Sequence, residues 1–170
     1  HGSWLFLSQA QYFLHPVRDH LKSQGYFFEI QGRQSLRLKV REALEAWRTL
    51  QRGNPITYDL AKVLYSYMTG NGVRVARGHK KILGEEDDTF TFEELRDTNG
   101  LLATLDMSWN EALDKVPGVD VAYVNALVRR GEDLTAPPRI KLSTIHGAKG
   151  GEADNVVLFT DLTVAAERSM

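Results

Sequence analysis

The sequence contains no cysteine, no apolar run of membrane-spanning length and no excess of charge of either sign. Without cysteine there are no disulfides and no thiolate metal sites, as is compatible with a reducing cytosol. The N-terminus lacks the charged-then-apolar layout of a secretory signal. We therefore expect a cytoplasmic protein without a membrane partner. His1-Gly2-Ser3 is typical of a residual tag and is left out of the predicted fold.

The charge balance constrains any contact with nucleic acid. Lys and Arg number 21 and Asp and Glu number 22, so the formal net charge is −1. Free-standing non-specific DNA binders usually carry a positive excess, which releases counterions from the phosphates. A DNA contact by this chain is therefore expected to use a few placed groups, to be shared with a partner domain, and to be weak in isolation.

The first residues predict a strand–helix–strand unit. Trp4–Leu7 is a short apolar run, and apolar residues then recur at helical spacing from Ala10 to Leu21. Pro16 lies inside that pattern, so the helix is expected to begin near Leu14 or to kink. Gly25 ends it and Tyr26–Ile30 forms the next strand, which predicts a parallel pair with a right-handed crossover. At 170 residues and 42% hydrophobic, the chain is long enough for one α/β domain with an inserted subdomain.

Residues 51–138 have the features of that insertion, because they are helical and loop-like. An amphipathic helix over about 36–50 precedes them, and further helices are expected at 58–68 and 119–130. Two capping boxes predict helix starts, one pairing Thr91 with Glu94 and the other Ser108 with Glu111. The insertion should separate the opening strands from two closing ones.

The closing segment, Ile140–Asp161, predicts a strand, a polar glycine-rich loop and a second strand. Ile140 and Leu142 alternate with polar residues, as in a half-covered strand, whereas Val156–Phe159 is continuously apolar, as in a strand covered on both faces. Glycines let the loop backbone approach a ligand closely. We expect this loop to contact a nucleotide or nucleic acid at the edge of a parallel sheet.

The same loop resembles a known motif. Ser143-Thr-Ile-His-Gly-Ala-Lys-Gly-Gly-Glu152 is similar to Thr-Leu/Ile-His-x-Ala-Lys-Gly-Leu-Glu, which is motif V of the UvrD/Rep-like superfamily 1 DNA helicases. Gly151 stands where the family has Leu. Ser8-Gln9-Ala10-Gln11 resembles the family's Arg-Ser/Thr-Asn-Ala-Gln stretch, with Leu7 in place of Arg and Gln9 in place of Asn. Gly32 and the helix after it resemble motif IVa.

The resemblance implies most of the second RecA-like motor domain (2A): a parallel sheet flanked by helices, built from residues 4–50 and 139–170. The helical insertion 51–138 then takes the place of a reduced 2B subdomain. The family's arginine motifs IV and VI would lie outside the chain, so the resemblance predicts part of a larger enzyme.

The resemblance also implies site residues, though no catalytic residue and no metal ligand. Glu152 would reach the ribose of ATP, with Gly150 beside it. The DNA strand would contact six residues, namely Ser8, Gln9, Thr144, His146, Gly147 and Lys149. For Lys149 an internal pairing with a carboxylate is an equal alternative. Hydroxyl, imidazole and backbone N–H groups are suitable donors to phosphate oxygens.

The sequence contains neither a Gly-x-x-x-x-Gly-Lys-Ser/Thr phosphate loop nor an acidic pair after an apolar strand for Mg²⁺. The chain alone is therefore not expected to hydrolyse ATP. By resemblance, ATP and Mg²⁺ would be held mainly by the N-terminal RecA-like domain of an ATP-dependent DNA helicase or translocase, with single-stranded DNA as the substrate. The alternative is an accessory or inactivated helicase-derived module that binds protein.

Three further features of the sequence have more than one interpretation. A hydrolase is not predicted from Ser143, His146 and Asp154, because Ser143 lacks a glycine-flanked elbow. Asp154 and Asn155 are instead expected to form the turn into the last strand. The basic cluster between Arg74 and Lys81 precedes Glu85–Asp88, which favours a solvated loop over a DNA grip. The larger aromatic residues are expected mostly in the core, namely Trp4, Trp47 and Tyr26-Phe27-Phe28.

Overall fold

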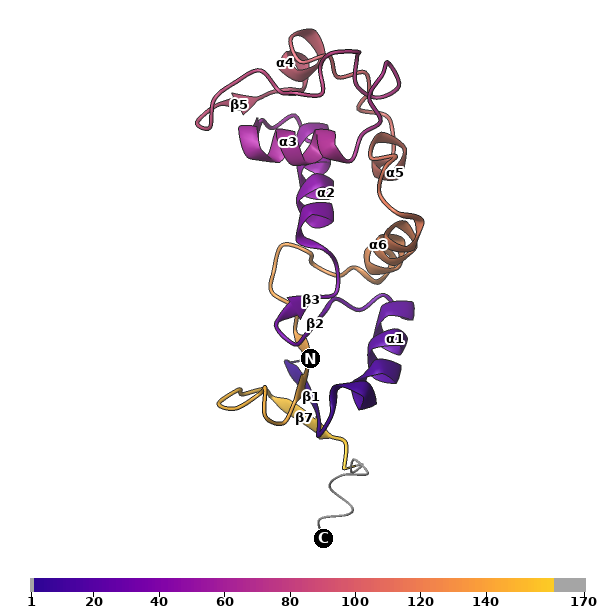
Figure 1. The fold of residues 1–170 in the computed structure, drawn as a ribbon, viewed down its shortest axis with the longest axis vertical. Helices are drawn as coiled ribbons and strands as arrows, with labels where there is room; N and C mark the ends of the chain where they lie inside the picture. The colour runs from indigo at the N-terminus through magenta and orange to yellow at the C-terminus, as the bar shows by residue number, and fades with distance from the viewer. Residues whose placement is uncertain (1, 161–170) are drawn as a thin grey trace. The chain divides into compact units, whose positions relative to one another are not determined.

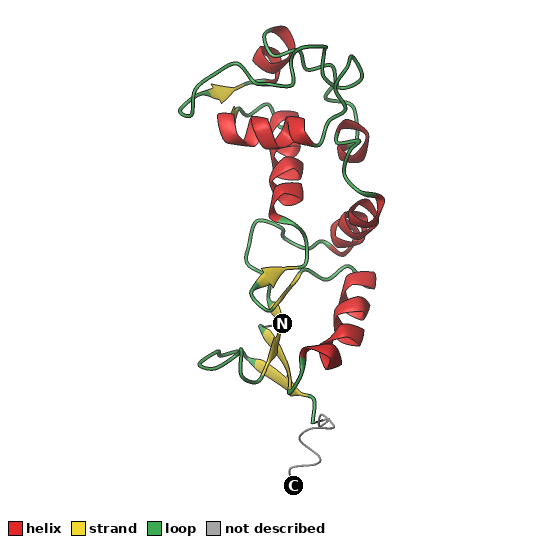
Figure 2. Ribbon diagram, viewed as in Figure 1, coloured by secondary structure: helices red, strands yellow, loops and turns green. Residues whose placement is uncertain are grey.

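The computed structural model describes residues 2–160 and divides the chain into two compact units. The sheet unit comprises the residues up to Leu36 and those from Ala122 onward, and the helical unit comprises Arg37–Val121. Figures 1 and 2 show the elements of each unit. No helix within 2–160 is both long and apolar enough to cross a bilayer.

The sheet unit contains a five-stranded sheet. Its strands are β1 (Trp4–Ser8), β2 (Phe28–Ile30), β3 (Arg33–Gln34), β6 (Ile140–Thr144) and β7 (Asn155–Leu158), in the order β3-β2-β6-β1-β7. The strands β1, β2, β6 and β7 are parallel, and β3 is antiparallel to β2. The predicted α/β class with a mostly parallel sheet flanked by helices is confirmed. This layout fits a RecA-like domain and is shared by other α/β folds.

The start of helix α1 follows the proline prediction. A 3₁₀ turn, η1 (Gln11–Leu14), leads into α1 (His15–Ser23), and Pro16 lies in its first turn. Proline is tolerated there because the first N–H groups of a helix have no partner within the helix. Gly25 follows the helix with φ +70°, a left-handed conformation that ends α1. The strands β1 and β2 are parallel as predicted, but β6 lies between them.

The two faces of the sheet are covered differently. Register places Phe28 and Leu142 on one face, and each is only 1% exposed. Lys141 and Leu5 lie on the other face, where the loop after β6 crosses the sheet. Figure 1 shows α1 on one side of the sheet and that loop on the other. The half-covered pattern predicted for β6 is therefore correct.

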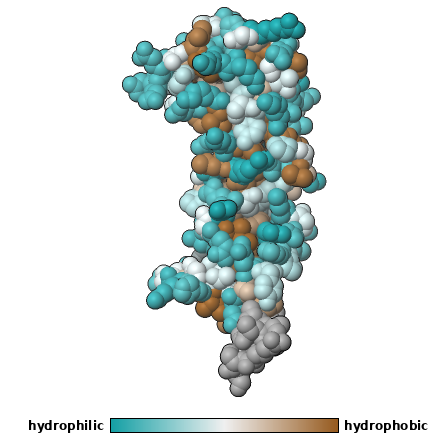
Figure 3. Space-filling view, in the orientation of Figure 1, coloured by the Kyte–Doolittle hydropathy of each residue, from teal (hydrophilic) through white to brown (hydrophobic). Residues whose placement is uncertain are grey.

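The prediction that Val156–Phe159 is covered on both faces is wrong. Among the strands within residues 2–160, β7 lies at the sheet edge and pairs only with β1, and Val156 and Leu158 are 57% and 53% exposed. A continuous apolar run does not distinguish an edge strand from a central one. Trp4 is also 39% exposed, contrary to expectation, whereas Trp47, Phe27 and Phe28 are buried as predicted. Figure 3 shows apolar surface near the C-terminal end of the described chain.

The helical unit is built around α2 (Leu38–Gln51) and α3 (Tyr58–Ser66). One face of α2 is fully buried and carries Val40, Ala43, Leu44, Trp47 and Leu50. Short elements follow, namely β4 (Ile56–Thr57), β5 (Thr89–Phe90), α4 (Phe92–Asp97) and α5 (Trp109–Ala112). Both predicted capping boxes are present, at the starts of α4 and α5.

The boundaries between the units differ from those predicted. The sequence placed them at 50/51 and 138/139, whereas the structure places them at 36/37 and 121/122. The first moves because the apolar face of α2 packs with α3, inside the helical unit. The second moves because α6 (Gly118–Arg130) continues into the sheet unit, where Tyr123 bonds to the segment before β2.

Tyr123 connects α6 to the strand region through its hydroxyl. The hydroxyl donates to the Tyr26 carbonyl over 2.5 Å and lies 2.7 Å from the Ser35 hydroxyl. The Tyr123 side chain is 3% exposed, and its burial raises its pKa to about 12. A phenolate could not donate to the Tyr26 carbonyl, so folding favours the neutral form.

We predict an alkaline loss of stability that Tyr123→Phe removes. The folded pKa lies above the ordinary value of 10, so the contribution is complete below pH 10 and is lost as the pH rises towards 12. A shift of this size corresponds to about 3 kcal/mol. The measurement is urea unfolding of both proteins at intervals across that window, followed by the methyl signals of the buried strand residues Leu5 and Leu142. Equal slopes against pH for the two proteins would contradict the prediction.

Candidate functional site

The candidate site lies where the parallel strands end. Ser8 ends β1 and Gln9 follows it, Gln31 and Gly32 follow β2, and the loop 145–154, here called the crossing loop, follows β6. Parallel strands present their carboxyl ends at one edge of the sheet, so three separate segments meet there. The Ile145 backbone N–H donates to the Ser8 carbonyl over 2.9 Å, which joins two of them directly.

The neighbouring strands β1 and β6 send their connections in opposite directions. From β1 the chain passes over β6 to reach β2, and from β6 it passes over β1 to reach β7. Right-handed crossovers in opposite directions lie on opposite faces of a sheet. The gap between β1 and β6 is therefore a topological switch point, the place where open α/β sheets bind ligands.

Most of the crossing loop is exposed to solvent. His146, Gly147, Lys149, Gly150 and Glu152 are all exposed, and Ile145 is 50% exposed. Within the described residues no hydrophobic segment covers them. Two bonds to Thr144 hold the start of the loop: the Thr144 hydroxyl accepts from the Gly147 N–H over 3.1 Å, and the Ala148 N–H donates to the Thr144 carbonyl over 3.0 Å. Its polar groups are open to a ligand.

A cavity of about 380 Å³ lies between the crossing loop and the sheet. Its floor comes from strand residues on the face opposite α1, namely Leu5, Glu29, Lys141 and Ser143, and its wall comes from Gly147–Glu152 with Gln31 and Gly32. The cavity therefore includes the predicted residues Gly147, Lys149, Gly150 and Glu152. It also includes residues that the sequence analysis did not select, Glu29, Gln31 and Lys141.

Two glycines of the loop are required for different reasons. Gly150 has φ +78° with open space around it, so its backbone conformation is what favours glycine. A Cβ on Gly147 would lie 3.0 Å from the Ser143 hydroxyl and 3.1 Å from the Thr144 hydroxyl. At Gly147, therefore, the two nearby hydroxyls would have to shift to make room for a side chain.

The two predicted residues at the end of β1, Ser8 and Gln9, differ in their exposure to solvent. Ser8 is fully buried, and its hydroxyl donates to the Ala10 carbonyl over 2.7 Å. Its side chain therefore caps the turn after β1 and does not reach the surface, which removes it from the set of candidate DNA contacts. Gln9 is exposed beside the crossing loop and stays in the set.

The end of the loop is structural, as predicted for Asp154 and Asn155. The Asp154 carboxylate accepts from the Ser3 backbone N–H at 2.7 Å and from the Ser3 hydroxyl at 2.8 Å, and these bonds lower its pKa. The Asn155 N–H donates to the Ser3 carbonyl. Asp154 therefore pairs with Ser3 rather than with His146, and the three residues of a hydrolase triad are not assembled. Ser3 takes part in the fold, although the sequence analysis had set it aside.

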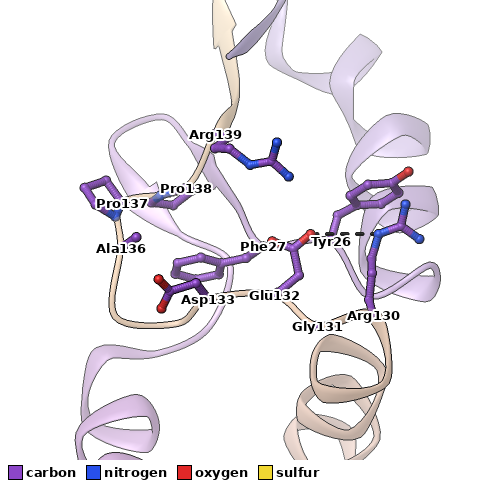
Figure 4. Close-up of a pocket in the computed structure, with 10 residues that line it drawn as sticks. All are labelled: Tyr26, Phe27, Arg130, Gly131, Glu132, Asp133, Ala136, Pro137, Pro138 and Arg139. Carbon is purple, nitrogen blue, oxygen red and sulfur yellow. Dashed lines mark ion pairs between the residues drawn. The ribbon is translucent and has the colours of Figure 1, made fainter. Parts of the chain in front are cut away.

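A larger cavity, of about 640 Å³, lies at the opposite end of the strands, next to the residues that lead into β2 and β6 (Figure 4). Its charged side chains balance, with Arg130 and Arg139 against Glu132 and Asp133. Arg130 stacks on the Tyr26 ring at 3.4 Å and pairs with Glu132 at 3.8 Å. Open α/β sheets bind ligands at carboxyl ends rather than here, so we regard this cavity as secondary.

Two residues of the basic cluster in the helical unit, Arg74 and Lys80, donate hydrogen bonds to backbone carbonyls. Arg74 donates to the Glu111 carbonyl over 2.8 Å and lies 3.8 Å from Asp114. The Lys80 ammonium donates to the Met68 carbonyl over 2.9 Å, just beyond the end of α3. These contacts agree with the predicted solvated loop. Among residues 2–160 there is no group of three or more His, Asp or Glu side chains that could hold a metal ion.

No protein-family model, curated protein or solved structure matches this chain.

Proposed function

We propose that the sheet unit is one half of the ATP and single-stranded DNA site of an ATP-dependent DNA helicase or translocase. The observation that carries the proposal is the exposed crossing loop, which spans the switch point between β1 and β6 beside Gln9. It is the segment with the motif V resemblance, and it lies at the sheet edge that α/β domains use for ligands. The sequence match and the position in the fold are independent of each other.

The roles within the loop follow from chemistry and position. Thr144 and His146 offer a hydroxyl and an imidazole to phosphate oxygens, and Gly147 allows the strand to approach the backbone. Gly150 and Glu152 lie further along the loop, where a carboxylate is suited to bonding ribose hydroxyls of ATP. The sequence has no phosphate loop, so on this proposal a partner motor domain supplies the phosphate-binding and Mg²⁺-binding groups.

The charges around the crossing loop support a DNA contact that is weak and is shared with a partner domain. Lys149 is the basic residue of the exposed loop, whereas Glu152 lies in the same loop and Glu29 lies on the cavity floor. With so few phosphate contacts, affinity should fall gently with salt, at a slope of about −1 to −2 on logarithmic axes. A free-standing basic DNA binder would show a much steeper slope.

The test is titration of the ¹⁵N-labelled chain with oligothymidylate, observed by NMR. Amides of Gln9 and residues 144–150 should shift, and His146→Ala should weaken binding by roughly 3- to 10-fold, because one hydrogen bond to a charged phosphate is lost. His20→Ala is the matched control, since His20 is an exposed histidine on α1 and should leave the affinity unchanged. Equal affinity of His146→Ala and wild type, or shifts confined to other surfaces, would rule the proposal out.

A further inference from the structure

The turn between β2 and β3 has an unusual residue in a strained conformation. Ile30 pairs with Arg33, so the turn has two central residues, Gln31 and Gly32, with φ of +52° and +74°. A hairpin turn with positive φ at both positions strongly prefers Asn-Gly, because Asn tolerates the left-handed region better than other residues with a Cβ. Glutamine at the first position costs stability.

A second turn of this chain has the favoured Asn-Gly pair. Asn71 and Gly72, in the loop after α3, have φ of +58° and +88°. Among residues 2–160, Gln31 and Asn71 are the non-glycine residues with positive φ. The helical unit thus uses the favoured pair, whereas the sheet unit uses a disfavoured residue at the edge of its candidate site. Strained backbone and broken local preferences tend to occur at functional positions.

The Gln31 side chain extends to the crossing loop. Its Oε1 lies 3.4 Å from where a Cβ on Gly147 would be, next to the Ser143 and Thr144 hydroxyls. The Gln31 N–H donates to the Leu142 carbonyl over 3.1 Å, which fixes the turn against β6. Asparagine is one methylene shorter, so its amide would withdraw from Gly147. The backbone conformation at position 31 favours Asn, whereas the side-chain length needed to approach Gly147 favours Gln.

We propose that Gln31 is a DNA-contacting residue and that the strained turn presents its carboxamide to the strand beside Gly147. This inference rests on the proposed function, because it assigns Gln31 to the DNA-contacting part of the crossing loop rather than to the Gly150–Glu152 part. The carboxamide N–H groups can donate to a phosphate or base edge, and its oxygen can accept. Gln31 is exposed and lines the same cavity as the loop.

The experiment compares Gln31→Asn and Gln31→Gly with wild type. Both variants relieve strain, so the sheet unit should melt about 1–3 °C higher, as followed by amide signals of β1 and β6. Both should also bind oligothymidylate roughly 3- to 10-fold more weakly, because the amide is withdrawn or absent. Asn71→Gln is the matched control: it should lower the melting temperature of the helical unit and leave the DNA affinity unchanged.

The possible results distinguish failure of the Gln31 inference from failure of the proposed function. If DNA shifts the crossing loop and Gln31→Asn binds as tightly as wild type, or melts lower, then Gln31 is a structural residue and the inference fails while the proposed function stands. If Mg-ATP rather than oligothymidylate shifts the Gln31 side-chain amide signals, the assignment to DNA is wrong. If neither probe shifts residues 144–152, the proposed function itself fails, and the inference fails with it.

Discussion

Replacing Gly25 with alanine is expected to destabilise the sheet unit strongly. Gly25 ends α1 with φ +70°, where a Cβ costs about 1–2 kcal/mol. The added Cβ would also lie 2.5 Å from the Ala126 carbonyl carbon and oxygen of α6, and backbone cannot move aside as a side chain can. With overpacking of about 1–3 kcal/mol, the total loss is about 2–5 kcal/mol. That is a large share of the stability of a small domain.

Amide hydrogen exchange measures this loss in each unit separately. Protection of β1 and β6 amides should fall by roughly 30- to 1,000-fold or more, and that of α2 and α3 should not change. Gly53→Ala is the matched control, because Gly53 follows α2 with φ +77° and has nothing within 4 Å of the added Cβ. It should cost only the conformational part, about 1–2 kcal/mol. Equal losses of stability for Gly25→Ala and Gly53→Ala would show that Gly25 does not lie against the α6 backbone.

Replacing Trp47 with alanine is expected to have the corresponding effect on the helical unit. Trp47 lies on the inner face of α2, is 0% exposed, and donates its indole N–H to the Met107 carbonyl over 3.3 Å. Truncating a fully buried Trp costs about 3–5 kcal/mol through lost burial and the remaining cavity. It also leaves the Met107 carbonyl without this donor. We expect helical circular dichroism to fall and strand amide signals to persist.

Trp4→Ala is the control for Trp47→Ala. Trp4 is 39% exposed on β1 and stacks on Phe6 with ring centroids 6.2 Å apart, so its removal should cost about 1 kcal/mol. Urea unfolding of the two variants supplies the comparison. If Trp4→Ala were as destabilising as Trp47→Ala, the open face of the sheet near β1 and β7 would have to be covered in solution.

Local patterns explain which elements could be predicted. Pro16 could be placed at a helix start and Gly25 after a helix end, because their backbone preferences act within one or two residues. The capping boxes at Thr91 and Ser108 were equally visible, since each needs only a hydroxyl and a carboxylate three residues apart. The strand positions of β1 and β6 followed from their apolar patterns.

Long-range pairing explains what was missed. The exposed edge position of β7 depends on strand order, and a run of apolar residues is compatible with either an edge or a centre. Ser8 was predicted to contact DNA, but it is buried and its hydroxyl donates to the Ala10 carbonyl, a contact that no pattern in the sequence marks. Gln31 was not selected because nothing adjacent in sequence marks it. Only its positive φ and its contact with Gly147 identify it.

The sequence by itself determined the α/β class, the positions of most helices and strands, and the polar, glycine-rich crossing loop, because these depend on neighbours within a few residues. The tertiary structure alone decided the strand order, the boundaries of the two units and the meeting of the end of β1, Gln31 and the crossing loop at one sheet edge. Those features join residues more than a hundred positions apart, and such pairings are fixed by packing and register, which no local pattern records.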